Sequence, residues 1–288
     1  MDVAVVDYRS LSAPEEFTRS LLETGFAVLV NHPLPQDLVQ FVYDEWLAFF
    51  RTENKHSYRF TDERQGGYYP PSVSETAKGQ SKRDLKEFFH VRPGGVFPTE
   101  VSRAAFNYRQ VAMEVNLTLL GWVDRNTPAA IGDQLSQSLQ SMMVGSTQSL
   151  LRILHYPPLT GGEEQGAVRA AAHEDINLLT VLPASNESGL QLLDKLGRWH
   201  DVPCDFGSIA VNSGDMLNQA SKGYYPSTTH RVVNPSGDGA LRSRMSMPMF
   251  LHPADDVVLD PDGLVGRRTA GEFLQERLRE LRSQDTTT

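Results

Sequence analysis

Two side chains that can bind a metal stand where an apolar strand begins, in RAAAHEDINLLTVL at residues 169–182. His173 and Asp175 are two positions apart, and residues i and i+2 of a strand lie on the same face of the sheet. Glu174 between them points to the opposite face. A neutral imidazole nitrogen and a carboxylate oxygen that converge on one point suit a divalent first-row metal. The spacing therefore predicts part of a metal site at the start of this strand.

A second histidine is needed, and His230 is the best placed in the chain. It lies in YYPSTTHRVVNP, at the start of another β-branched run, and enough chain separates it from His173 for several strands. His155 and His200 each lie inside an expected strand with no acidic residue two positions on. With Asp175, the two histidines form the ligand set of non-haem Fe(II) oxygenases. The alternative is that they are ordinary hydrogen-bonded residues at strand ends.

An arginine near His230 points to an anion. In ALRSRMSMPMF, residues 240–250, Arg244 and Ser246 share one face of an expected strand. If the intervening methionines pack against the core, Arg244 is buried, and a buried guanidinium without a partner costs several kcal/mol. Its planar fork matches a carboxylate, and the serine adds a donor. The alternative is an exposed edge strand, which Arg242 beside this pair would suit.

Composition narrows the class of protein. The chain has 288 residues, of which 40% are hydrophobic and 22% charged, and a net charge of −9. An acidic chain is a poor ligand for nucleic-acid backbones or anionic membranes, so we expect neither as a partner. The single cysteine, Cys204, allows no internal disulfide, and we find neither a secretory signal nor an apolar run of the ~18 residues that a membrane span needs. We expect a cytoplasmic protein that acts on a small molecule; the sequence indicates no oligomeric state.

The first half of the chain reads as helix-rich. Start and stop signals and apolar spacing predict helices at 12–25, 35–50, about 100–123 and about 127–144, with a strand at 26–30. Residues 59–98 show no clear period and read as a loop. Within them, 64–93 is a candidate lid that contributes to substrate specificity. The candidate substrate contacts are Tyr68, Tyr69, Arg83 and Lys86 in this segment and Asn177 and Gln191 in the second half.

From about residue 148 the pattern changes to short apolar runs separated by turn residues, which is typical of a β-sandwich or barrel. Examples are 176–182, 189–193, 208–211 and 245–251. LLDKLGRWHDV predicts a hairpin, and the charged segment after residue 269 predicts an amphipathic helix.

Taken in order, these motifs resemble the Fe(II)/2-oxoglutarate-dependent oxygenases, and more narrowly their isopenicillin N synthase-like branch. H-x-D, a distant histidine and R-x-S follow in the family's order. Further segments with the same likeness are ETGFAVLVNHPLP, LRILHYPP, GLQLLDKLGRWHDVP and GSIAVNSGDMLNQASKGYYPSTTHRVVNP. The chain departs from the family's pattern at Leu154 and His155, where asparagine and tyrosine are common, and in a longer spacing from His230 to Arg244.

The resemblance implies a mainly β fold with helices, a distorted double-stranded β-helix (jelly-roll) barrel with supporting N-terminal helices. It implies one oxygenase domain over 1–288: a helical and mixed region at 1–147, a jelly-roll core with the iron site at 148–252, and a C-terminal helix and tail at 253–288.

The resemblance also implies site residues and a reaction. His173, Asp175 and His230 would bind Fe(II), and Arg244, Ser246 and Tyr156 the co-substrate 2-oxoglutarate. The expected reaction uses O2 and converts 2-oxoglutarate to succinate and CO2 while a small molecule is hydroxylated, desaturated or cyclised. Two alternatives stay open: an Fe(II) oxidase of the isopenicillin N synthase or ACC oxidase type that needs no 2-oxoglutarate, and a non-catalytic cupin-like ligand-binding protein.

Overall fold

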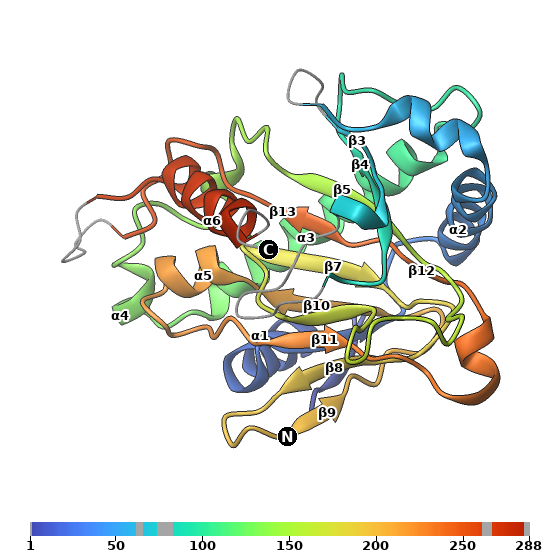
Figure 1. The fold of residues 1–288 in the computed structure, drawn as a ribbon. Coiled ribbons are helices and arrows are strands. Elements are labelled where there is room, and N and C mark those ends of the chain that lie inside the picture. The colour runs from blue at the N-terminus through green and yellow to red at the C-terminus, as the bar shows by residue number, and fades with distance from the viewer. Residues whose placement is uncertain (1, 62–65, 74–82, 261–266, 285–288) are drawn as a thin grey trace.

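The fold is two facing β-sheets with helices packed on the outside of the larger one (Figure 1). The structure, a computed structural model, describes residues 2–61, 66–73, 83–260 and 267–284. Among the described helices, none is both long and apolar enough to cross a bilayer.

The larger sheet has nine strands in the order β1-β2-β10-β7-β13-β5-β4-β3, with β12 also paired to β5. It takes strands from both halves of the sequence, and β2 joins them by pairing antiparallel to β10. Its strands are β1 (Val5–Asp7), β2 (Phe26–Val30), β3 (Gly67–Tyr69), β4 (Glu87–Val91), β5 (Leu150–Tyr156), β7 (Leu179–Pro183), β10 (Ile209–Ser213), β12 (Arg244–Ser246) and β13 (Met249–Leu251).

The smaller sheet has the order β6-β11-β8-β9. Its strands are β6 (Ala170–His173), β8 (Leu190–Leu193), β9 (Trp199–Asp201) and β11 (His230–Val232). The register between β6 and β11 shifts between His230 and Val232, which places His173 opposite His230 and Ala170 opposite Val232. Two apolar clusters lie between the sheets, and one of them joins Tyr156 of the large sheet to Ala170 of the small one.

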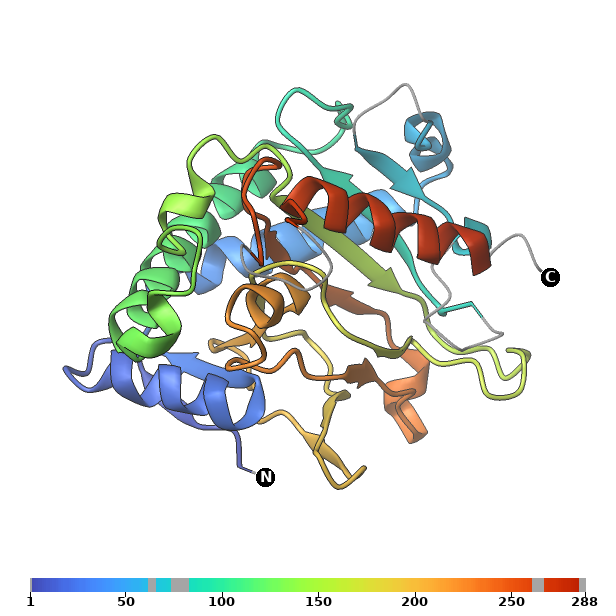
Figure 2. The ribbon, with the colours of Figure 1, turned by 90° about the vertical axis from the view of Figure 1, so that its left-hand side faces the viewer.

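Helices cover the other face of the large sheet. The three long N-terminal helices α1 (Ala13–Thr24), α2 (Gln36–Phe50) and α3 (Ala104–Asn126) form the main core with it. The short helices are α4 (Ala129–Gly132), α5 (Asp215–Ala220) and the 3-10 helices η1 (Glu53–Tyr58), η2 (Pro71–Val73), η3 (Ser141–Met143) and η4 (Gly237–Leu241). The C-terminal helix α6 (Ala270–Gln284) lies at one end of the strands (Figure 2), where Arg277 Nη2 approaches Asp215 Oδ2 of α5 at 3.4 Å.

Most of the expected elements are confirmed. The predicted helices at 12–25, 35–50 and 100–123 correspond to α1, α2 and α3, the hairpin to β8–β9 and the C-terminal helix to α6. Two expectations are wrong. The segment 127–144 forms only the short α4 and η3, since Pro128 and the serine-rich run after it do not sustain a helix. The supposed loop 59–98 contains β3 and β4, whose aromatic residues pair with one another and with β5.

The jelly-roll expectation is confirmed, but the described strands do not close into a barrel. No ladder joins the two sheets across the described residues. The side chains that connect them therefore decide how the facing surfaces are held together.

Candidate active site

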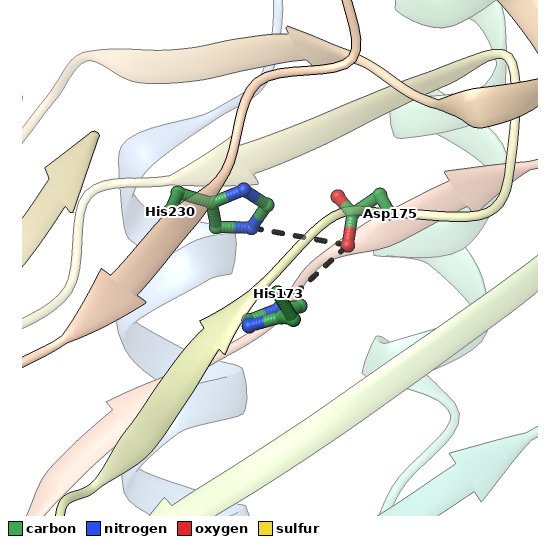
Figure 3. A group of neighbouring side chains, drawn as sticks. All are labelled: His173, Asp175 and His230. Carbon is green, nitrogen blue, oxygen red and sulfur yellow. Dashed lines mark ion pairs between the residues drawn. The ribbon is translucent and has the colours of Figure 1, made fainter. Parts of the chain in front are cut away.

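Three predicted ligands meet at the edge of the smaller sheet. His173 ends β6, Asp175 lies in the loop that follows, and His230 begins β11 (Figure 3). Nε2 of each histidine lies 3.9 Å from Asp175 Oδ1, and one potential ligand atom from each of the three lies within 4.8 Å of the others. The sequence prediction placed Asp175 on the strand itself; the strand ends two residues earlier, and the loop brings the carboxylate to the same point.

Backbone carbonyls orient both imidazole rings. His173 Nδ1 lies 2.7 Å from the carbonyl oxygen of Ala171, and His230 Nδ1 lies 3.1 Å from that of Thr228. A carbonyl only accepts, so each Nδ1 carries a proton, and Nε2 is the ring nitrogen that can offer a lone pair to a metal. Metal-binding histidines commonly donate their other nitrogen in this way. The two rings thus present acceptor atoms toward Asp175.

The carboxylate of Asp175 is oriented from its other oxygen. Thr180 Oγ1 donates to Oδ2 at 2.6 Å, and Asn212 Nδ2 donates to the same atom at 2.8 Å. Thr180 lies on β7 and Asn212 on the neighbouring β10, so two strands of the large sheet hold a ligand from the loop that follows β6. Oδ1 remains directed at the two histidines.

Protonation at neutral pH suits a metal. Burial, and then the charge of His230, lowers the pKa of His173 to about 4. Burial opposes ionisation of Asp175, but the two histidines and the hydrogen bonds from Asn212 and Thr180 outweigh it and hold the pKa of its carboxyl below the usual range. The site therefore offers a carboxylate and a neutral His173 imidazole, the protonation states that coordination requires.

Backbone hydrogen bonds hold the loop that carries Asp175 against the start of α5. Asp215 N–H donates to the Asp175 carbonyl at 2.7 Å, and Gly214 N–H donates to the Leu178 carbonyl at 3.1 Å. A Cβ at Gly214 would lie 2.3 Å from the Asn177 carbonyl oxygen and 2.8 Å from that of Asp175. Only glycine fits this close approach.

The predicted anion-binding residues lie along one face of β12 and β5. Arg244 and Ser246 are 2% and 4% exposed, so the exposed-edge alternative is wrong. Arg244 is the cross-strand partner of Tyr156, and its guanidinium carbon lies 5.2 Å from the tyrosine ring centroid. Its Nε donates to the Glu187 carbonyl at 3.1 Å, while its buried Nη1 has no hydrogen-bond partner in the described structure. A buried donor of this kind suits the binding of an anion.

The six candidate substrate contacts lie in different places. Tyr69 stacks on Phe88, with ring centroids 4.6 Å apart, and lies on the sheet face that carries Tyr156. Tyr68, its neighbour in β3, faces the helices and donates a short hydrogen bond to Glu87. Adjacent strand residues point to opposite faces, which separates the two tyrosines.

Lys86 lies close to the triad. Its Nζ contacts Asp84 Oδ2 at 2.8 Å, and Asp84 Oδ1 accepts the Ala171 N–H at 2.8 Å, which holds the pair against β6. The charge of Lys86 also contributes to the low pKa of His173, after burial and His230. Arg83, three positions earlier, is exposed.

The remaining two candidates make contacts within the protein. Asn177 is fully buried, and its Nδ2 donates to the Leu179 carbonyl and to Thr180 Oγ1, so it shapes the turn after Asp175. Gln191 bonds Asp201 and Arg231 on the opposite face of its strand from the buried Leu192. Of the candidate lid 64–93, residues 64, 65 and 74–82 lie outside the described residues.

One part of this face was not predicted from the sequence. Arg152 Nε donates to His90 Nε2 at 2.9 Å, and the guanidinium lies 4.4 Å from the Phe88 ring centroid. We call Tyr69, Phe88 and His90 the aromatic cluster. Arg152, Leu154 and Tyr156 are every second residue of β5 and therefore share one face of the sheet. The face expected for Tyr156 is thus also the face of Arg152.

Comparisons with known proteins agree with this geometry. Residues 147–253 match the 2OG-Fe(II) oxygenase superfamily, and residues 5–105 match the family described as non-haem dioxygenase in morphine synthesis N-terminal. A protein of Shewanella oneidensis assigned as an oxygenase has a crystal structure 48% identical in sequence, with a TM-score of 0.86 over 98% of this chain and 99% of that one. A protein of Caulobacter crescentus assigned to the 2OG-Fe(II) oxygenase family is 33% identical, with a TM-score of 0.78 over 96% and 98%.

A curated relative extends the likeness to plants. Gibberellin 2-beta-dioxygenase 5 of Oryza sativa subsp. japonica is 27% identical over 98% of this chain and 84% of its own length. These matches favour the 2-oxoglutarate-dependent activity over an oxidase that needs no 2-oxoglutarate, and over a non-catalytic cupin-like protein. The chain belongs to the 2OG-Fe(II) oxygenase superfamily and is an Fe(II)- and 2-oxoglutarate-dependent dioxygenase.

Proposed function

We propose that His173, Asp175 and His230 hold the iron of this dioxygenase. The observation that carries the proposal is the pair of Nδ1 contacts to backbone carbonyls, which leave both Nε2 atoms as acceptors beside Asp175 Oδ1. Two imidazole nitrogens and one carboxylate oxygen fit Fe(II) with positions left open for other ligands. When bound, iron and 2-oxoglutarate supply the oxidising chemistry: O2 is consumed, 2-oxoglutarate becomes succinate and CO2, and the substrate is oxidised.

We further propose that Arg244, Ser246 and Tyr156 bind the distal carboxylate of 2-oxoglutarate. The buried Nη1 of Arg244 without an acceptor supports this role. The guanidinium supplies charge and a directional donor, and Ser246 lies two positions along the same strand face. These residues orient the co-substrate so that its keto-acid end reaches the triad.

We also propose that the substrate binds at the aromatic cluster beside Arg152, with Lys86 near the triad. Stacked rings suit a flat or apolar body, and the Arg152 guanidinium suits an anionic substituent, whereas the charge of Lys86 is paired with Asp84. We propose a small organic substrate that carries an anionic group, contacting Tyr69 and Lys86 of the residues expected from the sequence. Small-molecule substrates also agree with the name of the gibberellin dioxygenase.

Residues 1–288 are proposed as one oxygenase domain, because strands from both halves of the chain share the nine-stranded sheet. The cytoplasmic location, and the absence of nucleic-acid and membrane partners, stay predictions from composition.

The test is an anaerobic titration with Fe(II) and then 2-oxoglutarate, followed in the visible spectrum. The wild-type protein is expected to develop a charge-transfer band that His173→Ala and Arg244→Ala both lose. Arg198→Ala is the control, because Arg198 is exposed and its Nε binds Asp194 Oδ2 at 2.9 Å on the β8–β9 hairpin. Iron binding without the band would contradict the co-substrate site, and no iron binding would contradict the triad. Succinate formed per oxidised product then tests each candidate substrate.

A further inference from the structure

A second arginine near Arg244 is buried, and it has no ion pair with any residue that the structure describes. Arg169 stands at the bend just before β6 and is 0% exposed. Its backbone N–H donates to Asn234 Oδ1 at 2.9 Å, and its Nη2 donates to the Arg242 carbonyl at 2.9 Å. Nε and Nη1 are buried and have no hydrogen-bond partner in the described structure. Two charged donors of one side chain are therefore unsatisfied.

Arg169 and Arg244 lie close enough to repel each other. Burial, and then the charge of Arg244, lowers the pKa of Arg169. The bond to Arg242 brings its guanidinium to the segment two residues before Arg244. Glu187 also lies near, but its Oε1 is bound to Arg242 Nε at 2.7 Å. Arg169 and Arg244 thus form a buried pair of like charges, each with an unpaired Nη1.

Such a pair is costly unless an anion joins it. An unpaired buried charge destabilises a protein strongly, and two like charges side by side add repulsion. A carboxylate has two oxygens with about four lone-pair directions, enough for two arginines and a hydroxyl. The two arginines also come from different sheets: Arg169 precedes β6 of the small sheet, and Arg244 begins β12 of the large sheet.

We propose that Arg169 binds the distal carboxylate of 2-oxoglutarate together with Arg244, so that the co-substrate links the two sheets. The inference rests on the proposed function. Arg169 then raises the affinity for 2-oxoglutarate and selects it over 2-oxo acids that lack a distal carboxylate. A 2-oxo acid with no distal carboxylate has nothing to offer this pair, and so gains nothing from Arg169.

The test measures binding without turnover. Fe(II)-loaded protein is titrated anaerobically with 2-oxoglutarate and, separately, with 2-oxobutyrate, which has the keto-acid end but no second carboxylate. Arg169→Met is expected to raise the dissociation constant of 2-oxoglutarate about 10- to 100-fold and to leave that of 2-oxobutyrate unchanged. In wild type, 2-oxoglutarate is also expected to raise the thermal unfolding midpoint, and this gain should shrink in the variant, because the link between the sheets is weakened.

Arg109→Met is the matched control. Arg109 is partly buried on α3, donates from Nη2 to the Ser149 carbonyl at 3.3 Å and also has an unpaired buried Nε. It lies at the far end of β5 from Tyr156, roughly 20 Å away along the strand. This variant is expected to bind both 2-oxo acids as wild type does.

Three results would overturn the inference. An unchanged 2-oxoglutarate constant in Arg169→Met, or an equal loss for both 2-oxo acids, would make Arg169 structural and leave the proposed function intact. Failure of wild type to bind 2-oxoglutarate would overturn the proposed function as well. Should Arg169→Met not fold, Arg169→Lys keeps the charge but not the planar fork. It is expected to weaken the binding of 2-oxoglutarate and to leave the binding of 2-oxobutyrate as in wild type. The same change in the dissociation constants of both acids would count against a role for Arg169.

Discussion

His173 and His230 are direct cross-strand partners on β6 and β11, and their ring centroids lie 4.4 Å apart. Each ring lies beside the backbone carbonyl two residues before it. The same local arrangement thus occurs on two strands that the chain reaches far apart in sequence. Because both rings are oriented by backbone atoms, the acceptor nitrogens face Asp175 before any metal binds.

The first prediction concerns this pair. His173→Ala removes one nitrogen ligand and is expected to abolish stoichiometric Fe(II) binding, a larger loss than the about 10- to 100-fold that outer hydrogen-bond partners contribute. The measurement is iron bound per chain after anaerobic loading and desalting. His200→Ala is the control, because His200 Nε2 also contacts a carboxylate, Asp194 Oδ2 at 2.8 Å, but on the β8–β9 hairpin. Equal iron content in the two variants would contradict the triad.

A second prediction tests how Asp175 is oriented. Thr180→Val keeps the shape of the side chain but removes the donor that lies 2.6 Å from Asp175 Oδ2. Iron affinity is expected to fall about 10- to 100-fold, because the carboxylate is held less firmly toward the histidines. Thr118→Val is the control: Thr118 is exposed on α3 and its hydroxyl donates to the Glu114 carbonyl at 3.0 Å. Unchanged affinity in Thr180→Val would show that Asn212 alone suffices.

Local spacing made the triad and the arginine predictable from the sequence. His173 and Asp175 are two positions apart at a strand end, and His230 opens a β-branched run. Arg244 and Ser246 share a strand face. For Arg244 and Ser246 the alternation of side chains along a strand carries this information, whereas Asp175 lies in the loop after β6 and only its closeness to His173 in the sequence indicated the site.

Other parts of the site depend on contacts that spacing does not encode. The sequence does not show which of Tyr68 and Tyr69 faces the site. The structure separates them because Gly67–Tyr69 is a strand paired to β4, and neighbouring residues of a strand lie on opposite faces. Arg169 lies in the same motif as His173, four positions earlier, but at a bend where no periodicity applies. The role inferred for Arg169 depends on its contact with Arg242 and on the nearby Arg244, and both residues lie far along the chain.

The third prediction uses the close approach at Gly214. Gly214→Ala places a Cβ against the backbone of Asn177 and Asp175, and backbone atoms cannot rotate away. The free energy of unfolding is expected to fall by about 1–3 kcal/mol, and iron affinity should fall with it as the Asp175 loop shifts. Denaturant unfolding and iron titration measure the two effects.

Gly132→Ala is the matched substitution. Gly132 lies in α4 with no atom within 4 Å of a built Cβ. Alanine there is expected to be neutral or stabilising by up to about 1 kcal/mol, since it reduces the freedom of the unfolded chain. If both variants unfold like wild type, the contact at Gly214 does not constrain the loop.

The last prediction concerns stability against pH. His252 follows β13 and is 8% exposed, and a backbone hydrogen bond with Phe250 only partly offsets the effect of its burial. Burial, and then repulsion by Arg92, lowers its pKa from the ordinary 6.5 to about 4; Arg152 acts in the same direction and Asp175 against it. As pH falls below 6.5 the unfolded chain takes up a proton that the folded chain does not, so the free energy of unfolding decreases until about pH 4.

His252→Gln removes this titration. From neutral pH to pH 4, the unfolding free energy of wild type is expected to fall by up to about 3 kcal/mol relative to that of the variant. Above pH 7 the difference between the two proteins should not change with pH. Urea unfolding of the metal-free proteins at several pH values measures it, and the titration of His173 cancels because both proteins contain it. A difference that stays constant over this range would mean that the folded protein accepts a proton on His252 as readily as the unfolded chain does.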